Sequence, residues 1–440
     1  MMTGMALSGE DAAHLLRRVG FGPLPADVDA LTGMSVSAAV DQVLNVSSAP
    51  PVVVPPEATL ASPTQDWWTR YVAIHSWWCD RMATTPCPIQ EKMTLFWHGH
   101  FCSGIQKVNN FPAIFNQNQT FRSMGMGSFR ALAQAVAVDP AMLVYLDNAL
   151  NVVWAPNENW ARESMELFTL GVNQYTQDDV VASARAWTGH GVDSTGTQYV
   201  FDPAAHDTGS KTFFGQTQNF DGPDILNLIL TGPTKAVAAQ FIADEVWSFF
   251  AYPNPEPSVS QAITADFLAS TDLDITALLT SVFNQPEFWS TKARQSLVRS
   301  PAEYVLATMR YSGLTSAQAH PEWYLANMGQ ELFEPPNVAG WRQNAYWLST
   351  AAFWARAQFA HDITWTLSTP TGPLSGVGSQ TAAQAVQTAY DLFGITSPAP
   401  TTTASLVAFA SSEENTANSW SIGPDLITLA LLSPDFQLSQ

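Results

Sequence analysis

The chain has 440 residues, of which 46% are hydrophobic and only 13% are charged, and its formal net charge is −20. This length exceeds that of one ordinary domain and by itself allows two or three, and the chain can bury a large core. The negative charge argues against a nucleic-acid-binding protein, because phosphate recognition needs fields of Lys and Arg, and it favours neutral or cationic partners.

Helical patterns dominate the first half of the chain. The segment SGEDAAHLLRRVGFG has a Ser cap, acidic residues in its first turn and a terminal Gly, which together predict a helix. A long aromatic helix is predicted at QDWWTRYVAIHSWWCDRMATT, and PIQEKMTLFWHGHF predicts another that begins with Pro. The segment GSFRALAQAVAVDPAMLVYLDN predicts two short helices that are separated at Pro140.

Residues 192–222 differ in character, because Gly, Thr, Asp and aromatic residues nearly alternate there. We expect one β-hairpin near residues 195–216, with strands near 197–202 and 211–215. Helical patterns return after this insertion and continue to the C-terminal third of the chain.

The alternating βαβ pattern of a doubly wound sheet is absent, so we predict a mainly α fold, namely a multi-helical single globular domain over residues 1–440. Residues 366–382 are typical of a flexible connector. No stretch approaches the roughly eighteen apolar residues that span a membrane, so we expect no membrane insertion. No secretory signal is visible at the N-terminus, so we expect a cytoplasmic protein, or an exported one whose signal has been removed.

The segment FWHGHF contains His98 and His100, which are candidate metal ligands. On a continuous helix the two rings would point roughly 200° apart. Gly99 is a residue at which the helix could end, which would let both rings converge. The alternative is one buried, hydrogen-bonded His and one His at the surface. The neighbouring Trp97 is a candidate substrate contact.

The segment NENWARESMELFTLG predicts a helix that carries an Arg and two acids in a chain with few charges. Glu163 and Glu166 are three residues apart and therefore share a face. They could bind a metal or act as catalytic acid and base, with Arg162 holding both. The alternative is a buried structural network in which Arg162 or Arg185 neutralises the acids. Asn159, in the first turn, is a candidate substrate contact.

The segment FDPAAHDTGSKTFFG places three further polar residues in the expected hairpin loop, and such loops often carry chemistry. His206 is a candidate metal ligand, Asp207 a candidate catalytic acid or base, and Lys211 a candidate substrate contact. The alternative is a set of turn-forming residues. The later segment PPNVAGW predicts a rigid aromatic loop, in which Trp341 either lines a pocket and contacts substrate or has a structural role.

Several known catalytic patterns are absent from the sequence. It has no Gly-x-Ser-x-Gly nucleophile elbow, no Gly-x-x-x-x-Gly-Lys phosphate loop and no His-Glu-x-x-His zinc motif. No Cys-x-x-Cys pair occurs among the three cysteines, which argues against a thiolate zinc site.

The motifs resemble, in the same order, those of the bacterial domain of unknown function 1800 family. The resemblance rests on HLLRRVGFGP, EKMTLFWHGHF, NENWARESMELFTLGV, FDPAAHDTGSKTFFG and ELFEPPNVAGW. It implies a bacterial protein that has the fold of this family and in which these motifs are important. It does not indicate which reaction the protein catalyses. Members often look exported, sometimes beside sulfatase-like partners. Many members carry His where this chain has Phe168, so we do not place Phe168 in a site.

Three hypotheses about function follow. The first is a hydrolase with a pocket formed by His98, His100, His206, Glu163, Glu166 and Asp207, with Arg162 holding the acids. A mixed set of His and carboxylate ligands suits zinc, manganese or iron, and a bound metal would activate a water molecule.

The second hypothesis is a glycoside hydrolase that pairs Asp207 with Glu163 or Glu166, without a metal. The third is a non-catalytic envelope or scaffold protein in which the polar motifs are buried networks. The enzymatic hypotheses imply a small-molecule or carbohydrate substrate, and the sequence leaves the oligomeric state open.

Overall fold

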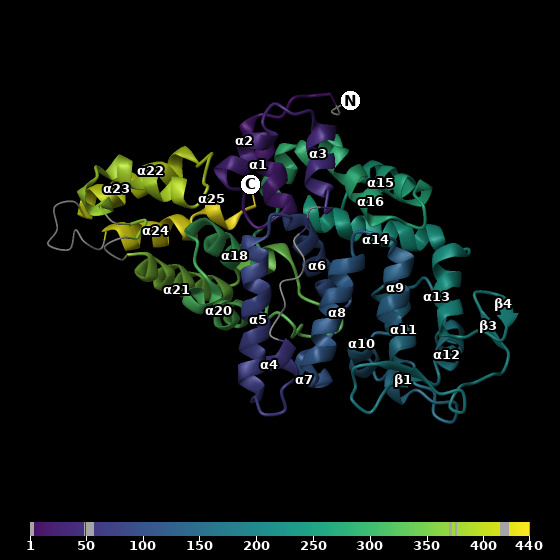
Figure 1. Ribbon diagram of the computed structural model, residues 1–440. Coiled ribbons are helices and arrows are strands. Elements are labelled where there is room, and N and C mark those ends of the chain that lie inside the picture. Colours follow the sequence, from purple (N-terminus) through teal and green to yellow (C-terminus); the bar gives the residue numbers. More distant parts are fainter. Residues whose placement is uncertain are drawn as a thin grey trace.

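The computed structural model describes residues 4–47, 49, 57–368, 372–374, 376–413 and 422–439. It is a single, mainly helical body, 64% helix, with two small antiparallel sheets (Figure 1). The mainly α fold class expected from the sequence is therefore confirmed.

The N-terminal half begins with three short helices at the top of Figure 1 and continues through the two long helices expected from the sequence. Its helices are α1 (Gly9–Val19), α2 (Pro25–Leu31), α3 (Val36–Leu44), α4 (Glu57–Ala61), α5 (Trp67–Thr84), α6 (Pro88–His100), α7 (Ile105–Val108), α8 (Phe111–Met124), α9 (Phe129–Ala137), α10 (Pro140–Tyr145), η1 (Asn148–Leu150), α11 (Asn159–Glu166) and α12 (Gln177–Ala186). The predicted break at Pro140 is confirmed, since Pro140 begins α10 and the Asp139 side chain caps it.

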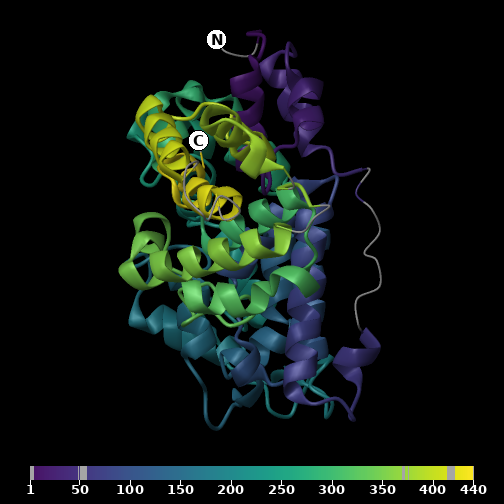
Figure 2. The same cartoon turned by 90° about the vertical axis from the view of Figure 1, so that its left-hand side faces the viewer.

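The C-terminal half forms the rest of the body, and its last helices make a layer on one side of α5 (Figures 1 and 2). Its helices are α13 (Gly222–Thr231), α14 (Lys235–Phe250), α15 (Pro257–Ala269), α16 (Ile275–Asn284), η2 (Pro286–Trp289), α17 (Thr291–Ser296), α18 (Pro301–Ser312), α19 (Ser316–Ala319), α20 (Pro321–Met328), η3 (Asn344–Leu348), α21 (Thr350–Leu367), η4 (Val377–Ser379), α22 (Ala382–Leu392), α23 (Pro400–Glu413), α24 (Ile422–Leu432) and α25 (Pro434–Gln437).

The expected β insertion is present, but its strands pair differently from the prediction. Strand β1 (His190–Val192) pairs with β2 (Tyr199–Phe201), and β3 (Lys211–Phe213) pairs with β4 (Gln216–Gln218). The two expected strands, β2 and β3, therefore belong to separate hairpins. The physical reason is local: Phe214 and Gly215 both have positive φ, at 44° and 74°, which suits a two-residue turn that closes β3 onto β4.

The predicted connector at 366–382 lies partly outside the described residues, since 369–371 and 375 are not among them. Its described part contains the end of α21 and the short η4. No single helix of the described ranges is long and apolar enough to cross a membrane, although α13 and α14, which are bent by 81° relative to each other, pass such a test together by length and composition.

Helix α6 lies between two hydrophobic cores. One core contains Met93 and Trp97 of α6 together with side chains of α1, α3, α9 and α11 to α16. The other contains Leu95 of α6 with side chains of α5, α18 and α20 to α24. Because both sides of α6 are covered, almost all its side chains are buried, including charged ones.

The carboxylate of Glu91, on α6, is the most deeply buried acid of the described chain. It is 0% exposed, and it accepts hydrogen bonds from Arg122 of α8 at 2.7 and 2.8 Å and from the Trp78 indole of α5 at 2.9 Å, with a further ion pair to Arg81. Burial raises the pKa of Glu91, but the charges of Arg122 and Arg81 outweigh it and hold the pKa below its usual range. This cluster ties α5, α6 and α8 together.

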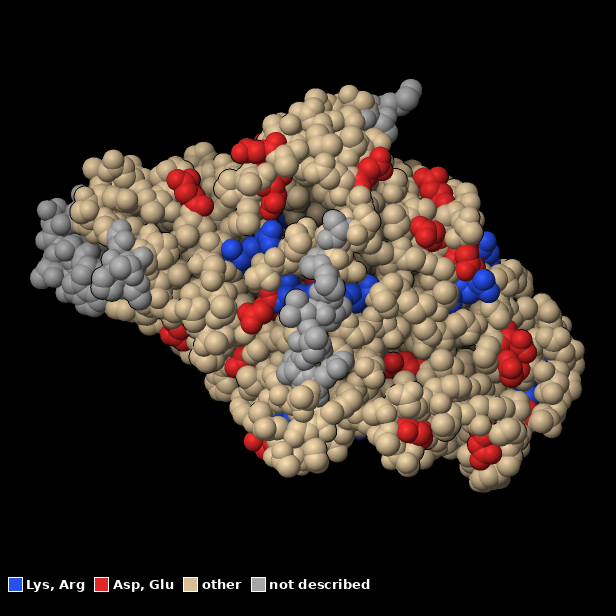
Figure 3. Space-filling view, viewed as in Figure 1, with Lys and Arg blue, Asp and Glu red and all other residues tan. Residues whose placement is uncertain are grey.

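Most of the surface shown in Figure 3 is neither acidic nor basic. Acidic side chains are scattered over this face, whereas the fewer Lys and Arg side chains gather mainly across its centre. The distribution agrees with acids that are spread along the whole sequence.

We predict that Glu91→Gln lowers the free energy of unfolding by about 3–5 kcal/mol, because it leaves Arg81 and Arg122 buried without a countercharge. Chemical denaturation at neutral pH measures this loss. The stabilisation by a carboxylate with a lowered pKa is complete above the ordinary Glu pKa and disappears as the pH falls through the lowered value. The difference between wild type and variant should therefore shrink in acid.

A matched control is Glu256→Gln, since Glu256 pairs with Lys292 at the surface. Its cost should stay below about 1 kcal/mol. An equal cost for the two variants would contradict the structural role assigned to Glu91.

Candidate functional site

His98 lies in the interior and holds a loop in place. Its Nε2 atom accepts a hydrogen bond of 2.9 Å from the backbone N–H of Phe333, and its ring packs against Trp78, Phe333 and Trp341. Burial lowers the pKa of His98 to about 3, so the ring is neutral and able to accept. His98 therefore attaches α6 to the loop that follows α20.

The same loop approaches α6 so closely that only glycine fits. Gly340 has a φ of +74°, and a Cβ atom there would lie 2.4 Å from the carbonyl oxygen of Gly99. The two glycines of the FWHGHF and PPNVAGW motifs thus meet backbone to backbone. Their contact fixes the position of Trp341, the next residue of the loop.

His100 points away from His98, toward a cleft. Its Nδ1 atom lies 2.7 Å from the Glu245 carboxylate, and its Nε2 atom lies 3.1 Å from the carbonyl oxygen of Phe168. Both partners are acceptors, so both ring nitrogens must carry a proton for both hydrogen bonds to form. The two contacts hold the ring from both edges and fix its orientation in the cleft wall.

The expected convergence of His98 and His100 is not found. Helix α6 continues through Gly99 to His100. Side chains two positions apart on a helix, such as those of His98 and His100, point roughly 200° apart. The two rings consequently enter different surroundings, one beside Phe333 and the other beside Glu245.

The helix α11 carries its acids near the cleft, but Arg162 does not hold them. Its guanidinium donates to Glu158 at 3.1 Å and to Gln177 at 2.9 Å. Glu166 instead accepts a hydrogen bond from the Tyr175 hydroxyl. Among the described residues, no side chain or backbone group donates to the Glu163 carboxylate, and burial together with the nearby charge of Glu166 raises the pKa of Glu163.

The third motif forms a closed cluster at the β insertion. Arg185 of α12 binds the Asp207 carboxylate through Nε at 2.7 Å and Nη2 at 3.2 Å. The buried Lys211 ammonium donates to the Gly209 carbonyl at 3.0 Å and to Asn219 at 3.1 Å. His206 contacts the carbonyl of Thr188 at 2.8 Å through Nδ1. These bonds hold the loop between β2 and β3, which matches the turn-forming alternative.

Two further candidates are also engaged in structure. Trp97 is fully buried in the core, and its indole N–H donates to the Gly125 carbonyl at 2.8 Å, so it does not reach the cleft. The backbone N–H of Asn159 donates to the Asn157 side chain at 2.9 Å, at the start of α11.

The candidate histidine ligands do not fit one metal site. His98 accepts from a backbone N–H, both nitrogens of His100 face acceptors, and His206 lies in the separate loop cluster. Across the part of the chain that the structure describes, no group of three or more His, Cys, Asp or Glu side chains is arranged to hold a metal ion.

A cleft of about 850 Å³ brings together the remaining predicted residues, His100, Glu166 and Trp341. It runs between α6, α11, α14 and the loop at 338–343, and Phe96 and Phe241 contribute aromatic walls. Two acids of α14 that the sequence analysis missed, Asp244 and Glu245, also line it. The signal for them was present: they are adjacent acids inside the otherwise apolar segment AAQFIADEVWSFF.

The acids of the cleft stand in different surroundings. Burial raises the pKa of the Asp244 carboxyl above its usual range. Glu166, by contrast, accepts the Tyr175 hydroxyl, and burial together with Glu166 raises the pKa of Tyr175 to about 12. Tyr175 therefore stays protonated and keeps donating to Glu166. A pair of titratable groups whose surroundings push their pKa values apart can serve as a catalytic acid and base.

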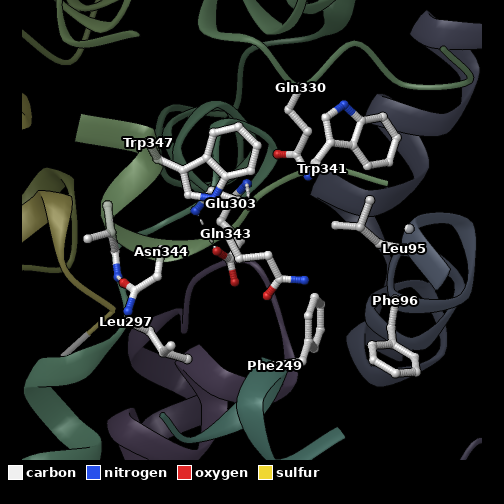
Figure 4. A pocket seen from close by; sticks show the side chains of 13 residues that line it. Leu95, Phe96, Phe249, Leu297, Glu303, Gln330, Trp341, Gln343, Asn344 and Trp347 are labelled. Atoms are coloured by element: carbon white, nitrogen blue, oxygen red, sulfur yellow. Dashed lines mark hydrogen bonds between the residues drawn. The ribbon is translucent and has the colours of Figure 1, made fainter. Parts of the chain in front are cut away.

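A smaller recess of about 60 Å³ adjoins the cleft, and the two share Phe96, Gly99, Trp341 and Gln343 as lining residues. Figure 4 shows this recess with Trp341 and Trp347 along one side and the side chains of Glu303 and Gln343 near its centre. The cleft thus has an acidic open part and a narrow inner part with aromatic walls.

These features define a mainly helical protein with an acidic cleft that contains one histidine. The family described as protein of unknown function (DUF1800) matches residues 14–438, and the chain belongs to this family. The resemblance expected from the motifs is therefore confirmed. No curated protein and no solved structure matches this chain.

We predict that His98→Phe lowers the free energy of unfolding by about 1–3 kcal/mol, because it keeps an aromatic ring but leaves the buried Phe333 N–H without an acceptor. Limited proteolysis should also cut the loop at 331–341 faster. Elemental analysis should give the same metal content for wild type and variant, whereas a metal ligand at this position would make the contents differ.

The control is His361→Phe, at a ring that is more than half exposed, and its effect should stay within about 0.5 kcal/mol. A His98→Phe variant as stable as the wild type would contradict the role of His98 as a hydrogen-bond acceptor.

Proposed function

We propose that the protein is a hydrolase that uses carboxyl groups for acid and base catalysis in the cleft, on a neutral or cationic small molecule or carbohydrate. The observation that carries the proposal is that Glu166 of α11 and Asp244 of α14 open onto the same cleft in contrasting surroundings. Asp244 serves as the general acid, and Glu166 is the base that activates water.

The charge of the cleft supports the choice of substrate. Glu166, Asp244 and Glu245 line it with a single histidine, so an anionic substrate would be repelled. Trp341, Phe96 and Phe241 offer aromatic faces on which an apolar face of a substrate can stack. A cleft of several hundred cubic ångströms is the usual size for small ligands.

His100 and Glu245 have a positioning role in this proposal. The ring of His100 lies between the Glu245 carboxylate and the carbonyl of Phe168, so its orientation in the cleft wall is fixed. Neither residue donates or accepts the transferred proton.

The narrower form of the proposal is a glycoside hydrolase. Two carboxyl groups on separate elements can act as the acid and the base in hydrolysis of a glycosidic bond, and the aromatic walls beside them can stack on sugar rings. The pair is now Glu166 with Asp244, because Asp207 is bound by Arg185 in the separate loop cluster. The proposal assigns no step to a metal, since the candidate histidines are held by other partners.

A second candidate function, a non-catalytic envelope or scaffold protein, is favoured by the closed clusters around Asp207 and Glu91. In such a protein the cleft would bind a partner without chemistry. The exchange of each cleft acid for its amide separates the two candidates.

We predict that Glu166→Gln and Asp244→Asn each lower kcat by at least about 10²-fold, as is typical when a general acid or base is removed. The measurement is turnover of a panel of uncharged 4-nitrophenyl glycosides and esters by the purified protein. Because Asp244 acts in its protonated form, the rate should fall as the pH rises through its raised pKa, and Asp244→Asn should lose this alkaline limb.

The control is Asp178→Asn, at an exposed acid of α12, which should keep the wild-type kcat. If the wild type turns over none of the panel, or if both cleft variants match the control, the enzymatic proposal is contradicted and the scaffold function gains support.

A further inference from the structure

Four buried arginines near the N- and C-terminal helices have no ion-pair partner among the residues that the structure describes. They are Arg17 and Arg18 of α1, Arg299 just before α18, and Arg356 of α21, and each is at most 9% exposed. Within the described residues, no carboxylate lies within 4.0 Å of their guanidinium groups. Buried charges are normally paired, so four buried guanidinium groups without a described carboxylate partner require an explanation in a chain of net charge −20.

Arg17 and Arg299 both line one cavity of about 330 Å³, together with Arg294. The Arg17 guanidinium makes no hydrogen bond to any described residue, and its Nε atom is fully buried. The Nη1 atom of Arg299 is likewise buried without a hydrogen-bond acceptor among the described residues. The Tyr311 hydroxyl lies beside this guanidinium, but burial raises the pKa of Tyr311, so the hydroxyl is neutral and supplies no countercharge. The Phe436 ring packs against the Arg299 guanidinium at 4.2 Å.

The other two arginines increase the positive charge behind this cavity. Arg18 donates only to the carbonyl of Ala293, and its Nε and Nη1 atoms have no partner in the described chain. Arg356 donates to the Gln437 side chain and to the carbonyl of Arg299, each at 2.6 Å. Burial and the charges of neighbouring arginines lower the pKa of Arg17 to about 10 and that of Arg18 to about 9.

The acids around the cavity do not neutralise this group. Glu303 is the ion-pair partner of Lys92, and Asp11 is the partner of Arg294. Glu10 and Asp435 also line the cavity, but neither lies within ion-pair distance of Arg17 or Arg299. One oxygen of Asp435 accepts the backbone N–H of Ala399 at 3.1 Å. Among the described groups, the four arginines outnumber these two acids, which leaves an excess of positive charge.

We propose that the cavity between α1, α17, the C-terminal end of α22 and α25 binds a phosphate group, either as free phosphate or as a small phosphate monoester. The guanidinium groups of Arg17 and Arg299 are the principal ligands. Each presents parallel N–H donors that match two oxygens of a phosphate. The dianion supplies the countercharge that the surrounding acids do not.

The size and lining of the cavity fit this ligand. A volume of about 330 Å³ leaves space beyond a phosphate ion for a short organic group. Thr291, Thr396 and Ser397 line the same cavity and offer hydroxyls. None of these residues lines the acidic cleft, so the phosphate site is independent of the function proposed for that cleft.

The test is isothermal titration calorimetry of the full chain with inorganic phosphate and with glycerol phosphate, at constant ionic strength set with NaCl. We expect saturable binding of one equivalent, and a Tm that rises with ligand concentration. Arg17→Met and Arg299→Met should each weaken binding by about ten- to a hundredfold, because each loses charge-assisted hydrogen bonds. Tighter binding of glycerol phosphate would identify a monoester as the ligand.

A second readout separates ligand binding from a structural role. Without phosphate, Arg17→Met should be at least as stable as the wild type, because it removes a buried charge that has no partner. Only the phosphate-dependent gain in Tm should disappear. Arg17→Lys keeps the charge but loses the forked donors, so it should bind with intermediate affinity.

The control is Arg130→Met, at a partly exposed arginine paired with Asp272, which should bind phosphate as the wild type does. The proposal is overturned if neither ligand binds the wild type, if Arg17→Met and Arg299→Met bind as tightly as the control, or if Arg17→Met lowers Tm equally with and without phosphate.

Discussion

The carboxylate of Glu91 lies in the interior between α5, α6 and α8, where an isolated charge would be very costly, and Arg81 and Arg122 neutralise it. This ion-pair cluster fixes α6 between two hydrophobic cores. Because α6 is fixed, His98 and His100 face opposite sides. His98 holds the loop that carries Trp341, and His100 reaches Glu245. Two walls of the cleft therefore depend on charges buried farther along the same helix.

The polar motifs divide into closed clusters and an open one. Around Asp207 and around Glu91, hydrogen bonds and ion pairs satisfy the charged groups and hold segments together. At the cleft, Glu166 and Asp244 remain accessible to a ligand, and their surroundings differ. The four arginines near the terminal helices form a third type of polar group, because they are buried but have no carboxylate partner among the described residues. Chemistry is expected where charge is neither fully paired nor fully solvated.

Local sequence signals predicted the helices well, because caps and prolines act over a few residues. Ser8 caps α1 as expected, and Pro140 begins α10 at the expected break. The cleft was only partly predictable. His100, Glu166 and Trp341 were identified, but their companions Asp244 and Glu245 come from a helix about eighty residues beyond α11. A convergence of this kind depends on long-range packing. The continuation of α6 through Gly99 was also missed, since glycine marks both helix ends and close backbone contacts such as that with Gly340.

The central claim is that burial in the cleft raises the pKa of a carboxyl group that acts as the general acid, and the titration of Asp244 tests it most directly. The measurement is carboxyl ¹³C NMR of labelled wild type, with Asp244→Asn used to assign the resonance. The account predicts that the Asp244 resonance titrates above the ordinary Asp value of 3.8. A resonance that titrates at or below that value would show a solvated surface carboxylate, and it would contradict the acid role assigned to Asp244.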